Sequence, residues 1–281
     1  MRCQVGLAEW RLAPSGVAAF RLAAEVGADG LQLDFGGPGR GVLVDGPGRV
    51  EQLRAASAAT GVGVLALAGN LLNDIGLTAE PAVVRPVLTR LVDAAGALGA
   101  PLLIVPSFRR SAITDQAGFE RTVAALRWTA ARAQDRGILL ASENVLPADR
   151  ARRLVDQVGS PAFRLLLDTF NPVAHGLSPA VLAAELGPCL ADQVHLKDGP
   201  PDVGPSPLLG AGQGGLRDTL AALGDGPARV RALVLENDYR DNDGVRLRAD
   251  LAWARQAALR WSRVPAGSRR PHADTRTGRQ A

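Results

Sequence analysis

Short apolar runs alternate along the chain with longer alanine- and leucine-rich segments in which apolar residues recur at helical spacing. The runs that predict strands lie at residues 3–8, 30–35, 63–68, 101–106, 137–143, 164–168, 192–197 and 232–237. Most are continuously apolar, as expected of parallel strands that are covered on both faces. Amphipathic helices are predicted between them, for example at residues 14–27, 47–61, 120–137 and 247–261. Several of these helical segments end on glycine, which favours a helix C-terminus.

This repeated alternation of strand and helix predicts an α/β fold with a parallel sheet. Eight strand–helix units favour a single-domain (β/α)8 TIM barrel over residues 1–263. An open, doubly wound sheet is the alternative architecture. Residues 264–281 are polar, lack hydrophobic periodicity and are expected to form a disordered basic tail.

The composition is that of a globular protein with a sizeable core, because 47% of the residues are hydrophobic and 21% are charged. A net charge of +4 invites comparison with nucleic-acid-binding proteins. Much of that excess positive charge lies in the tail, which contains one acidic residue, Asp274, against four arginines: Arg269, Arg270, Arg276 and Arg279. The remainder of the chain is close to neutral, so no nucleic-acid partner is expected.

Cysteine use and hydropathy point to a cytoplasmic protein. Cys3 and Cys189 are far apart in the sequence, so neither a disulfide framework nor a thiolate metal site is expected. The first residues lack the pattern of a secretory signal, and no apolar run approaches the roughly 18 residues of a membrane span. We therefore expect no membrane partner.

Ionisable residues end or interrupt four consecutive predicted strands: Glu143, Asp168, His195 and Glu236. In a (β/α)8 barrel the carboxyl ends of the strands form the active site. Three carboxylates at one rim would repel one another, and a divalent cation resolves that conflict. Carboxylate oxygens with one imidazole nitrogen suit Mn²⁺, Mg²⁺ or Co²⁺. For any single residue, a helix N-cap or an ion pair with arginine or lysine is the alternative.

The segments SENVLP, LLLDTFN, QVHLKD and LVLEND, in this order, resemble the xylose isomerase-like TIM barrel family of sugar isomerases and epimerases. GADGLQLDF and LAGNLLNDIGLT resemble the family's second-strand and third-strand segments, so the resemblance extends over residues 3–262. It implies that Glu143, Asp168, His195 and Glu236 are metal ligands, and that Glu143 and Glu236 also form an acid/base pair. Mn²⁺ is the expected ion, with Mg²⁺ or Co²⁺ as alternatives. Endonuclease IV shares the fold, but three histidines are too few for its zinc centre.

The implied activity is isomerisation or epimerisation of a sugar, a sugar phosphate or another polyhydroxy ketone. Moving a proton beside a carbonyl from one face to the other needs two bases, and a metal stabilises the enediolate between the two transfers. An inosose-dehydratase-like lyase would use the same groups and is one alternative, and a non-catalytic barrel subunit is another. We expect a small carbohydrate-like substrate, no organic cofactor, and a possible homo-oligomer.

Further candidates for substrate contact are Trp10, Asn70, Ser107, Asn171, His175 and Lys197. Asn171 stands where related enzymes often have a histidine, so it is expected to bind a hydroxyl rather than transfer a proton. Lys197 lies on the same side of its strand as His195, which favours either a cation beside a substrate oxygen or an ion pair. Trp10 and Phe35 are candidates for an apolar wall, with core packing as the alternative. For His175 the alternative is a structural role.

The segment LLGAGQGGLRD contains a GxGxxG pattern at Gly210, Gly212 and Gly215. No strand is predicted immediately before it, which argues against a dinucleotide site. We expect a loop after the seventh strand whose backbone amides bind substrate or phosphate. Arg109 and Arg110, beyond the fourth strand, are candidates for binding a phosphate or carboxylate, or else are ordinary surface residues.

Overall fold

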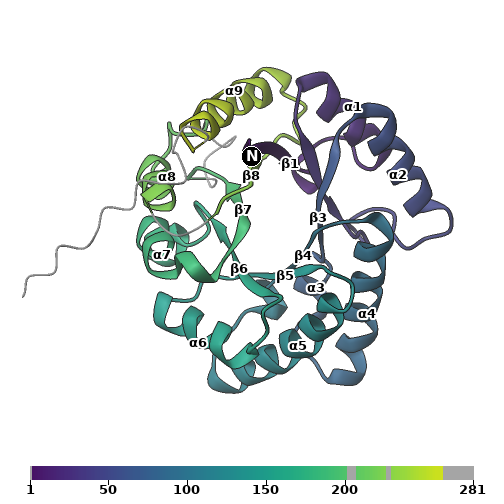
Figure 1. The fold of residues 1–281 in the computed structure, drawn as a ribbon, viewed down its shortest axis with the longest axis vertical. Helices are drawn as coiled ribbons and strands as arrows, with labels where there is room; N and C mark the ends of the chain where they lie inside the picture. The colour runs from purple at the N-terminus through teal and green to yellow at the C-terminus, as the bar shows by residue number, and fades with distance from the viewer. Residues whose placement is uncertain (1, 201–206, 226–228, 262–281) are drawn as a thin grey trace, which may run out of the picture.

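A closed barrel of parallel strands, joined in chain order, forms the centre of the molecule (Figure 1). The computed structural model describes residues 2–200, 207–225 and 229–261. The strands are β1 (Gln4–Ala8), β2 (Gly30–Asp34), β3 (Gly63–Ala68), β4 (Leu102–Pro106), β5 (Leu139–Glu143), β6 (Phe163–Asp168), β7 (Leu190–Leu196) and β8 (Ala232–Leu235). β8 pairs with β1 and closes the barrel.

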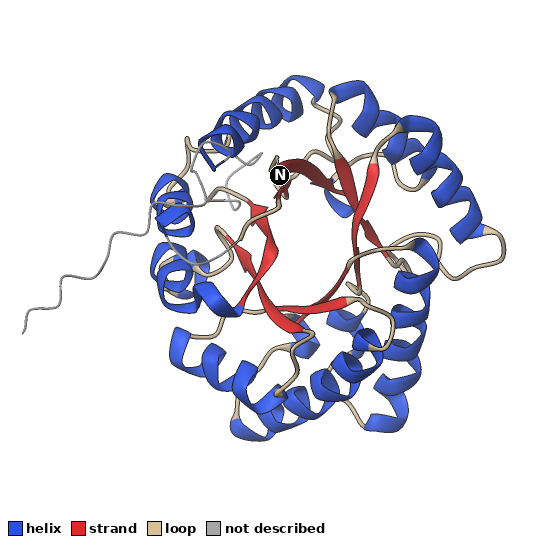
Figure 2. Ribbon diagram, in the orientation of Figure 1, coloured by secondary structure: helices blue, strands red, loops and turns tan. Residues whose placement is uncertain are grey.

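Helices surround this barrel on its outside (Figure 2). They are α1 (Val17–Val26), α2 (Arg49–Thr60), α3 (Leu72–Ile75), α4 (Pro81–Leu98), α5 (Gln116–Gln134), α6 (Ala148–Val158), α7 (Pro179–Leu186), α8 (Leu216–Asp225) and α9 (Gly244–Trp261). Short 3-10 turns follow several strands: η1 (Glu9–Arg11), η2 (Arg109–Ser111), η3 (Val173–His175) and η4 (Gly187–Cys189). Local chemistry sets some of the helix ends. Asp115, for example, caps α5 by accepting a hydrogen bond from the Gly118 amide at 2.6 Å.

The predicted (β/α)8 barrel is confirmed, and the alternative of an open sheet is wrong because β8 closes onto β1. The predicted strand positions agree with the observed ones to within two residues at each end. The largest differences are the start of β5 at Leu139, the start of β7 at Leu190 and the end of β8 at Leu235. The tail predicted at residues 264–281 lies outside the described residues.

The barrel has an inner and an outer packing layer, because successive residues of a strand point to opposite faces. The outer layer, between strands and helices, holds most of the leucine, valine and phenylalanine core. Inside the barrel, small residues such as Ala66, Ala68, Ala141 and Ala191 pack with a few larger apolar side chains. These small residues leave room for polar groups along the barrel axis, below the carboxyl ends of the strands.

None of the helices described, in residues 2–261 with the two internal gaps, is both long and apolar enough to cross a membrane.

Candidate active site

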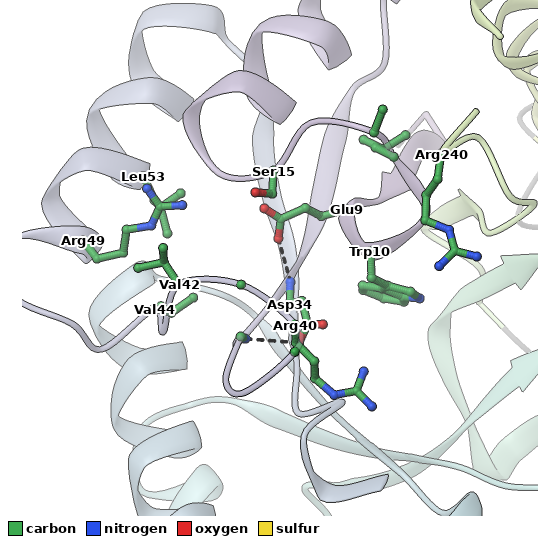
Figure 3. A pocket seen from close by; sticks show the side chains of 15 residues that line it. Glu9, Trp10, Ser15, Asp34, Arg40, Val42, Val44, Arg49, Leu53 and Arg240 are labelled. Atoms are coloured by element: carbon green, nitrogen blue, oxygen red, sulfur yellow. Dashed lines mark hydrogen bonds between the residues drawn. The ribbon is translucent and has the colours of Figure 1, made fainter. Parts of the chain in front are cut away.

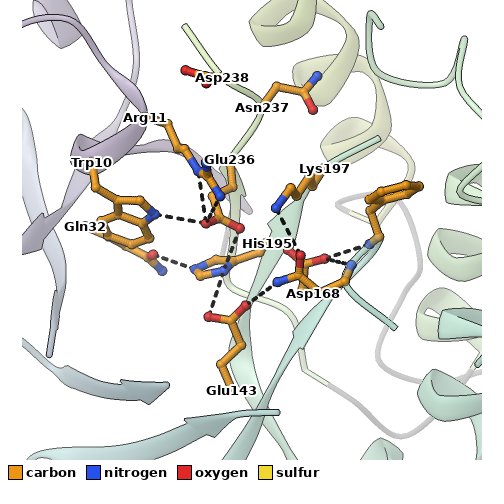
Figure 4. Close-up of polar contacts among 12 residues, drawn as sticks. Trp10, Arg11, Gln32, Glu143, Asp168, His195, Lys197, Glu236, Asn237 and Asp238 are labelled. Carbon is orange, nitrogen blue, oxygen red and sulfur yellow. Dashed lines mark hydrogen bonds and ion pairs between the residues drawn. The ribbon is translucent and has the colours of Figure 1, made fainter. Parts of the chain in front are cut away.

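Glu143, Asp168, His195 and Glu236 converge at the carboxyl end of the barrel (Figure 4). Glu143 ends β5, Asp168 ends β6, His195 lies on β7, and Glu236 directly follows β8. Strand register brings them level: Asp168 pairs with His195, and His195 pairs with Val234, two residues before Glu236. One ligand atom from each residue lies within 4.8 Å of the others, and all four side chains are buried. The convergence expected from the strand ends is therefore present.

The two glutamates are each held by one carboxylate oxygen. Oε1 of Glu236 accepts a hydrogen bond from Trp10 Nε1 at 2.9 Å and two from the Arg11 guanidinium at 3.3 Å. Oε1 of Glu143 accepts from Asn171 Nδ2 at 2.9 Å. In both residues Oε2 is turned towards His195, at 3.6 Å from Nδ1 for Glu143 and 3.4 Å for Glu236. One oxygen therefore fixes each side chain, and the other faces the site.

The orientation of His195 is fixed by a chain of hydrogen bonds through the barrel interior. Gln193 Nε2 donates to the Leu65 carbonyl at 2.7 Å, and Gln193 Oε1 accepts from Gln32 Nε2 at 2.9 Å. Gln32 Oε1 lies 2.7 Å from His195 Nε2. A backbone carbonyl can only accept, so Gln193 must present its Nε2 to Leu65 and its Oε1 to Gln32. Gln32 must then donate through Nε2 and accept through Oε1, so His195 Nε2 carries a hydrogen. Nδ1 is then the nitrogen that faces the carboxylates.

The cluster has the donor set of a divalent metal site. Asp168 Oδ1 accepts backbone hydrogen bonds from Phe170 and Asn171. Among the described residues, the buried atoms Asp168 Oδ2, His195 Nδ1 and Glu236 Oε2 have no hydrogen-bond partner. Buried polar atoms without partners are costly, and here they point at one another. A hard or borderline divalent cation bound by these atoms and by Glu143 would satisfy all of them.

The charges of the cluster perturb one another. Burial, together with the negative charge of Glu236, raises the pKa of Asp168 to about 7. Burial opposes protonation of His195, but the carboxylates of Glu143 and Glu236 outweigh it and raise the pKa of the imidazole to about 10. Burial would also raise the pKa of Glu236, yet neighbouring cations, Arg11 first among them, lower it well below its usual value. Without metal, the cluster therefore holds protons that a metal ion must displace.

A cavity of about 350 Å³ opens directly above the cluster. Five of the six predicted substrate contacts line it: Trp10, Asn70, Asn171, His175 and Lys197. Lys197 Nζ donates to Asn171 Oδ1 at 3.0 Å, and Asn171 in turn donates to Glu143. Among the described residues Lys197 forms no ion pair, and its side chain lines the cavity, so a contact with a substrate oxygen stays a prediction.

Two other predicted residues lie elsewhere. Ser107 is buried, with its hydroxyl 3.4 Å from that of Ser142, and it does not line the cavity. Phe35 is fully buried in the outer core and has the Arg90 guanidinium 5.4 Å from its ring centroid. For Phe35, core packing is therefore the correct interpretation, and the apolar wall is wrong.

The glycine-rich loop after β7 binds an anion, but that anion is a side chain of the protein itself. The buried carboxylate of Asp198 accepts hydrogen bonds from the amides of Gly199, Gly210, Gly212 and Gly214 at 2.9–3.1 Å. A Cβ at Gly212 would lie 2.4 Å from Asp198 Oδ1, so the close approach requires glycine. Our expectation that these amides bind substrate is therefore wrong, because Asp198 already occupies them.

Sequence reasoning missed several residues of the site: Arg11, Gln32, Arg40, Gln193 and Arg240. Gln32 had a detectable signal, because it stands between two leucines of a predicted strand, where a buried amide needs a partner; Gln193 stands next to Asp192 and is less distinctive. The arginines lie in loops or turns without periodicity, and nothing in the sequence distinguishes them from other surface arginines.

Comparison with known proteins assigns the family. A family model described as the xylose isomerase-like TIM barrel matches residues 20–257. The chain belongs to the xylose isomerase-like TIM barrel family. The resemblance seen in the sequence motifs is thereby confirmed.

Proteins named as epimerases are among those similar to this xylose isomerase-like chain. It is 75% identical over 259 residues to a protein from Actinoplanes sp. named 2-epi-5-epi-valiolone 7-phosphate 2-epimerase, covering 92% of this chain and 96% of that protein. Similar solved structures include a xylose isomerase domain protein from Planctomyces limnophilus, with a TM-score of 0.74 and 17% identity over 93% of this chain and 98% of that one. An L-ribulose 3-epimerase has a TM-score of 0.72 and 17% identity, covering 96% and 100%.

The two structural likenesses show the shared fold, and the close relative shows the class of activity. This member of the xylose isomerase-like family is an enzyme of the isomerase and epimerase class. The alternative of a non-catalytic barrel subunit is therefore wrong.

Proposed function

We propose that the protein is a divalent-metal-dependent epimerase that inverts a carbon next to the carbonyl of a phosphorylated polyhydroxy ketone. The observation that carries the proposal is the arrangement of Glu143 and Glu236, each fixed by one oxygen while the other faces the space above His195. The name of the relative that is 75% identical supports this substrate class, since it denotes a 2-epimerase of a ketone 7-phosphate.

The ligand set consists of Glu143, Asp168, His195 and Glu236. A bound divalent ion would polarise the substrate carbonyl and stabilise the negative charge that develops on its oxygen. Mn²⁺ is the ion we expect, with Mg²⁺ or Co²⁺ as alternatives, because the set combines three carboxylates with one imidazole nitrogen. Removing the metal with a chelator and restoring each ion separately tests this order.

The glutamates supply the proton transfers. One carboxylate takes the proton as the carbon–hydrogen bond breaks, and the other, protonated at the start, returns its own proton to the opposite face of the same carbon. The two residues thereby exchange protonation states. Because Arg11 favours the ionised form of Glu236, we assign Glu236 as the carboxylate that takes the proton first. Asn171 holds Glu143 in place through Oε1.

The test uses purified protein, each metal in turn, and 2-epi-5-epi-valiolone 7-phosphate in deuterated water. Proton NMR should show the epimer at carbon 2 with deuterium at that carbon, because the returning proton comes from a group that exchanges with solvent. Glu143→Gln and Glu236→Gln should lower the rate by at least about 100-fold, since general acid–base groups contribute on the order of 10²–10⁴. Glu185→Gln, an exposed glutamate on α7, is the control and should leave the rate unchanged.

An inosose-dehydratase-like lyase would use the same residues but would expel a hydroxyl as water. Such a reaction gives an enone that absorbs in the ultraviolet. A dehydrated product in place of the epimer would refute the proposed function. The cytoplasmic location and the homo-oligomeric state stay predictions, which cell fractionation and light scattering test.

A further inference from the structure

Two cavities meet at the mouth of the barrel. The first, of about 350 Å³, lies above Glu143 and Glu236, and the second, of about 340 Å³, lies beside it over the β2 loop. Both are lined by Trp10, Arg40 and Arg240, and Figure 3 shows the two arginine side chains beside the indole. We propose that this junction binds the phosphate group of the substrate, with Arg40 and Arg240 as its ligands. The inference rests on the proposed function, because it requires the rest of the substrate to lie above the glutamates.

The charge lining the first cavity favours an anion. Its cationic side chains are Arg11, Arg40, Arg109, Lys197 and Arg240, whereas its acidic side chains are Glu143 and Glu236. A divalent ion at the cluster below would add further positive charge. An uncharged sugar gains no electrostatic attraction from this excess of positive charge, whereas a phosphate dianion is attracted by it.

Arg40 is held in position without using all of its donors. Its Nε donates to Asp74 at 2.8 Å, its Nη2 lies 2.7 Å from the same oxygen, and its side chain is 19% exposed. Asp74, on α3, also accepts from Arg109 Nη1 at 3.2 Å. One carboxylate therefore gathers two guanidinium groups and neutralises only one of them. Within the described part of the chain, Nη1 of Arg40 has no hydrogen-bond partner.

Arg240 is anchored in a similar way on the other side of the junction. Its Nε and Nη2 donate to the two oxygens of Asp238, two residues earlier in the same loop. Its Nη1 has no partner among residues 2–200, 207–225 and 229–261. Arg40 follows β2 and Arg240 follows β8, so the two groups approach the junction from different loops. In both arginines Nη1 remains to donate a charge-assisted hydrogen bond to a phosphate oxygen, and pre-positioned groups lose little entropy on binding.

The junction lies apart from the residues proposed to transfer protons, so its effect on substrate binding can be measured separately from its effect on the reaction. Arg40 and Arg240 make no contact with the four metal-ligand side chains among the described hydrogen bonds and ion pairs, whereas Arg11 binds Glu236 directly. Loss of either rim arginine should therefore weaken substrate binding and leave proton transfer intact. The same loss should have no effect on a substrate that lacks phosphate.

The experiment compares 2-epi-5-epi-valiolone 7-phosphate with the same compound without its phosphate, using the metal-loaded enzyme. Arg40→Gln and Arg240→Gln should each raise KM for the phosphorylated compound at least about tenfold, the loss expected of a charge-assisted hydrogen bond. Their kcat, and KM for the unphosphorylated compound, should stay within about twofold of the native values. Arg240→Lys keeps the charge and should recover part of the loss. Arg121→Gln is the control for the chemical change, because Arg121 is exposed on α5 and lines neither cavity.

Inorganic phosphate provides an independent probe. It should inhibit the native enzyme competitively, and its binding, followed by ³¹P NMR, should weaken in Arg40→Gln and Arg240→Gln but not in Arg121→Gln. Equal changes in KM for both compounds, or unchanged phosphate binding, would overturn the inference. If the native enzyme acts equally well on both compounds, the proposed epimerase function stands and the phosphate site fails. If it acts on neither, the proposed function fails, and the ³¹P measurement alone decides the phosphate site.

Discussion

The hydrogen-bond chain behind His195 gives a sharp prediction for Gln32→Leu. Leucine has nearly the same size as glutamine but can neither accept from His195 Nε2 nor donate to Gln193 Oε1. All three side chains are buried, so no bulk water reaches the atoms left without partners. The substitution thus removes the restraint on the imidazole while changing the packing little.

The size of the effect follows from the two groups left unpaired. Each buried polar group without a partner costs about 1–3 kcal/mol, so the free energy of unfolding should fall by about 2–6 kcal/mol. Loss of the group that orients a ligating histidine also lowers metal affinity by about 10–100-fold. Gln193→Leu should have a smaller effect on metal affinity, because Gln193 touches Gln32 and not His195 itself.

Metal affinity is measured by competition with a fluorescent chelator, and stability by urea unfolding in the presence of EDTA. Gln52→Leu, an exposed glutamine on α2, is the control for the chemical change and should alter neither quantity. A folded Gln32→Leu variant that binds Mn²⁺ within twofold of the native protein would refute the role assigned to Gln32.

Three further predictions concern protonation, the indole and a helix cap. Because the pKa of Asp168 is about 7 and that of His195 about 10, metal binding at pH 8 should release one proton, from His195, and affinity should rise about tenfold per pH unit. Below pH 7 the dependence should steepen towards a hundredfold per unit as Asp168 also binds a proton; calorimetric titration in buffers of different ionisation enthalpy measures both, and a pH-independent affinity would contradict the assignment. Trp10→Phe removes the 2.9 Å hydrogen bond to Glu236 and should lower kcat/KM about tenfold in steady-state assays without changing the fold seen by circular dichroism. Asp115→Ala removes the cap of α5 and should lower the free energy of unfolding by about 1 kcal/mol at unchanged activity; an equal loss of activity would show that the change is not confined to the helix end.

The barrel could be predicted from the sequence because its pattern is local. Continuous apolar runs and helical periodicity report burial within a few residues, and repetition of the unit gives the architecture. The four residues proposed as metal ligands were predictable for a related reason. The carboxyl ends of all strands lie at one rim, and Glu143, Asp168, His195 and Glu236 each occupy a strand end or a position just before or after it.

Contacts between distant loops and strands were not predictable in the same way. Gln32 and Gln193 lie on β2 and β7, which are not neighbours in the barrel, so their hydrogen bond depends on the width of the interior and not on any pairing rule. Arg40 and Arg240 are 200 positions apart, in loops whose course is set by packing. Composition could not distinguish them from Arg110, which lies close to the same rim but does not line the cavities.

In the loop after β7, a glycine-rich motif of the kind that binds external anions binds a carboxylate of the same chain. Asp198 occupies the ring of amides that, in a nucleotide-binding protein, would receive a phosphate. A chain that lost this carboxylate, through Asp198→Gly, would expose an empty cradle of N–H donors and would acquire affinity for small external carboxylates such as formate or acetate. This one substitution would therefore create an anion-binding site. It would also remove the carboxylate that joins Gly199 to the segment 210–214 of the loop.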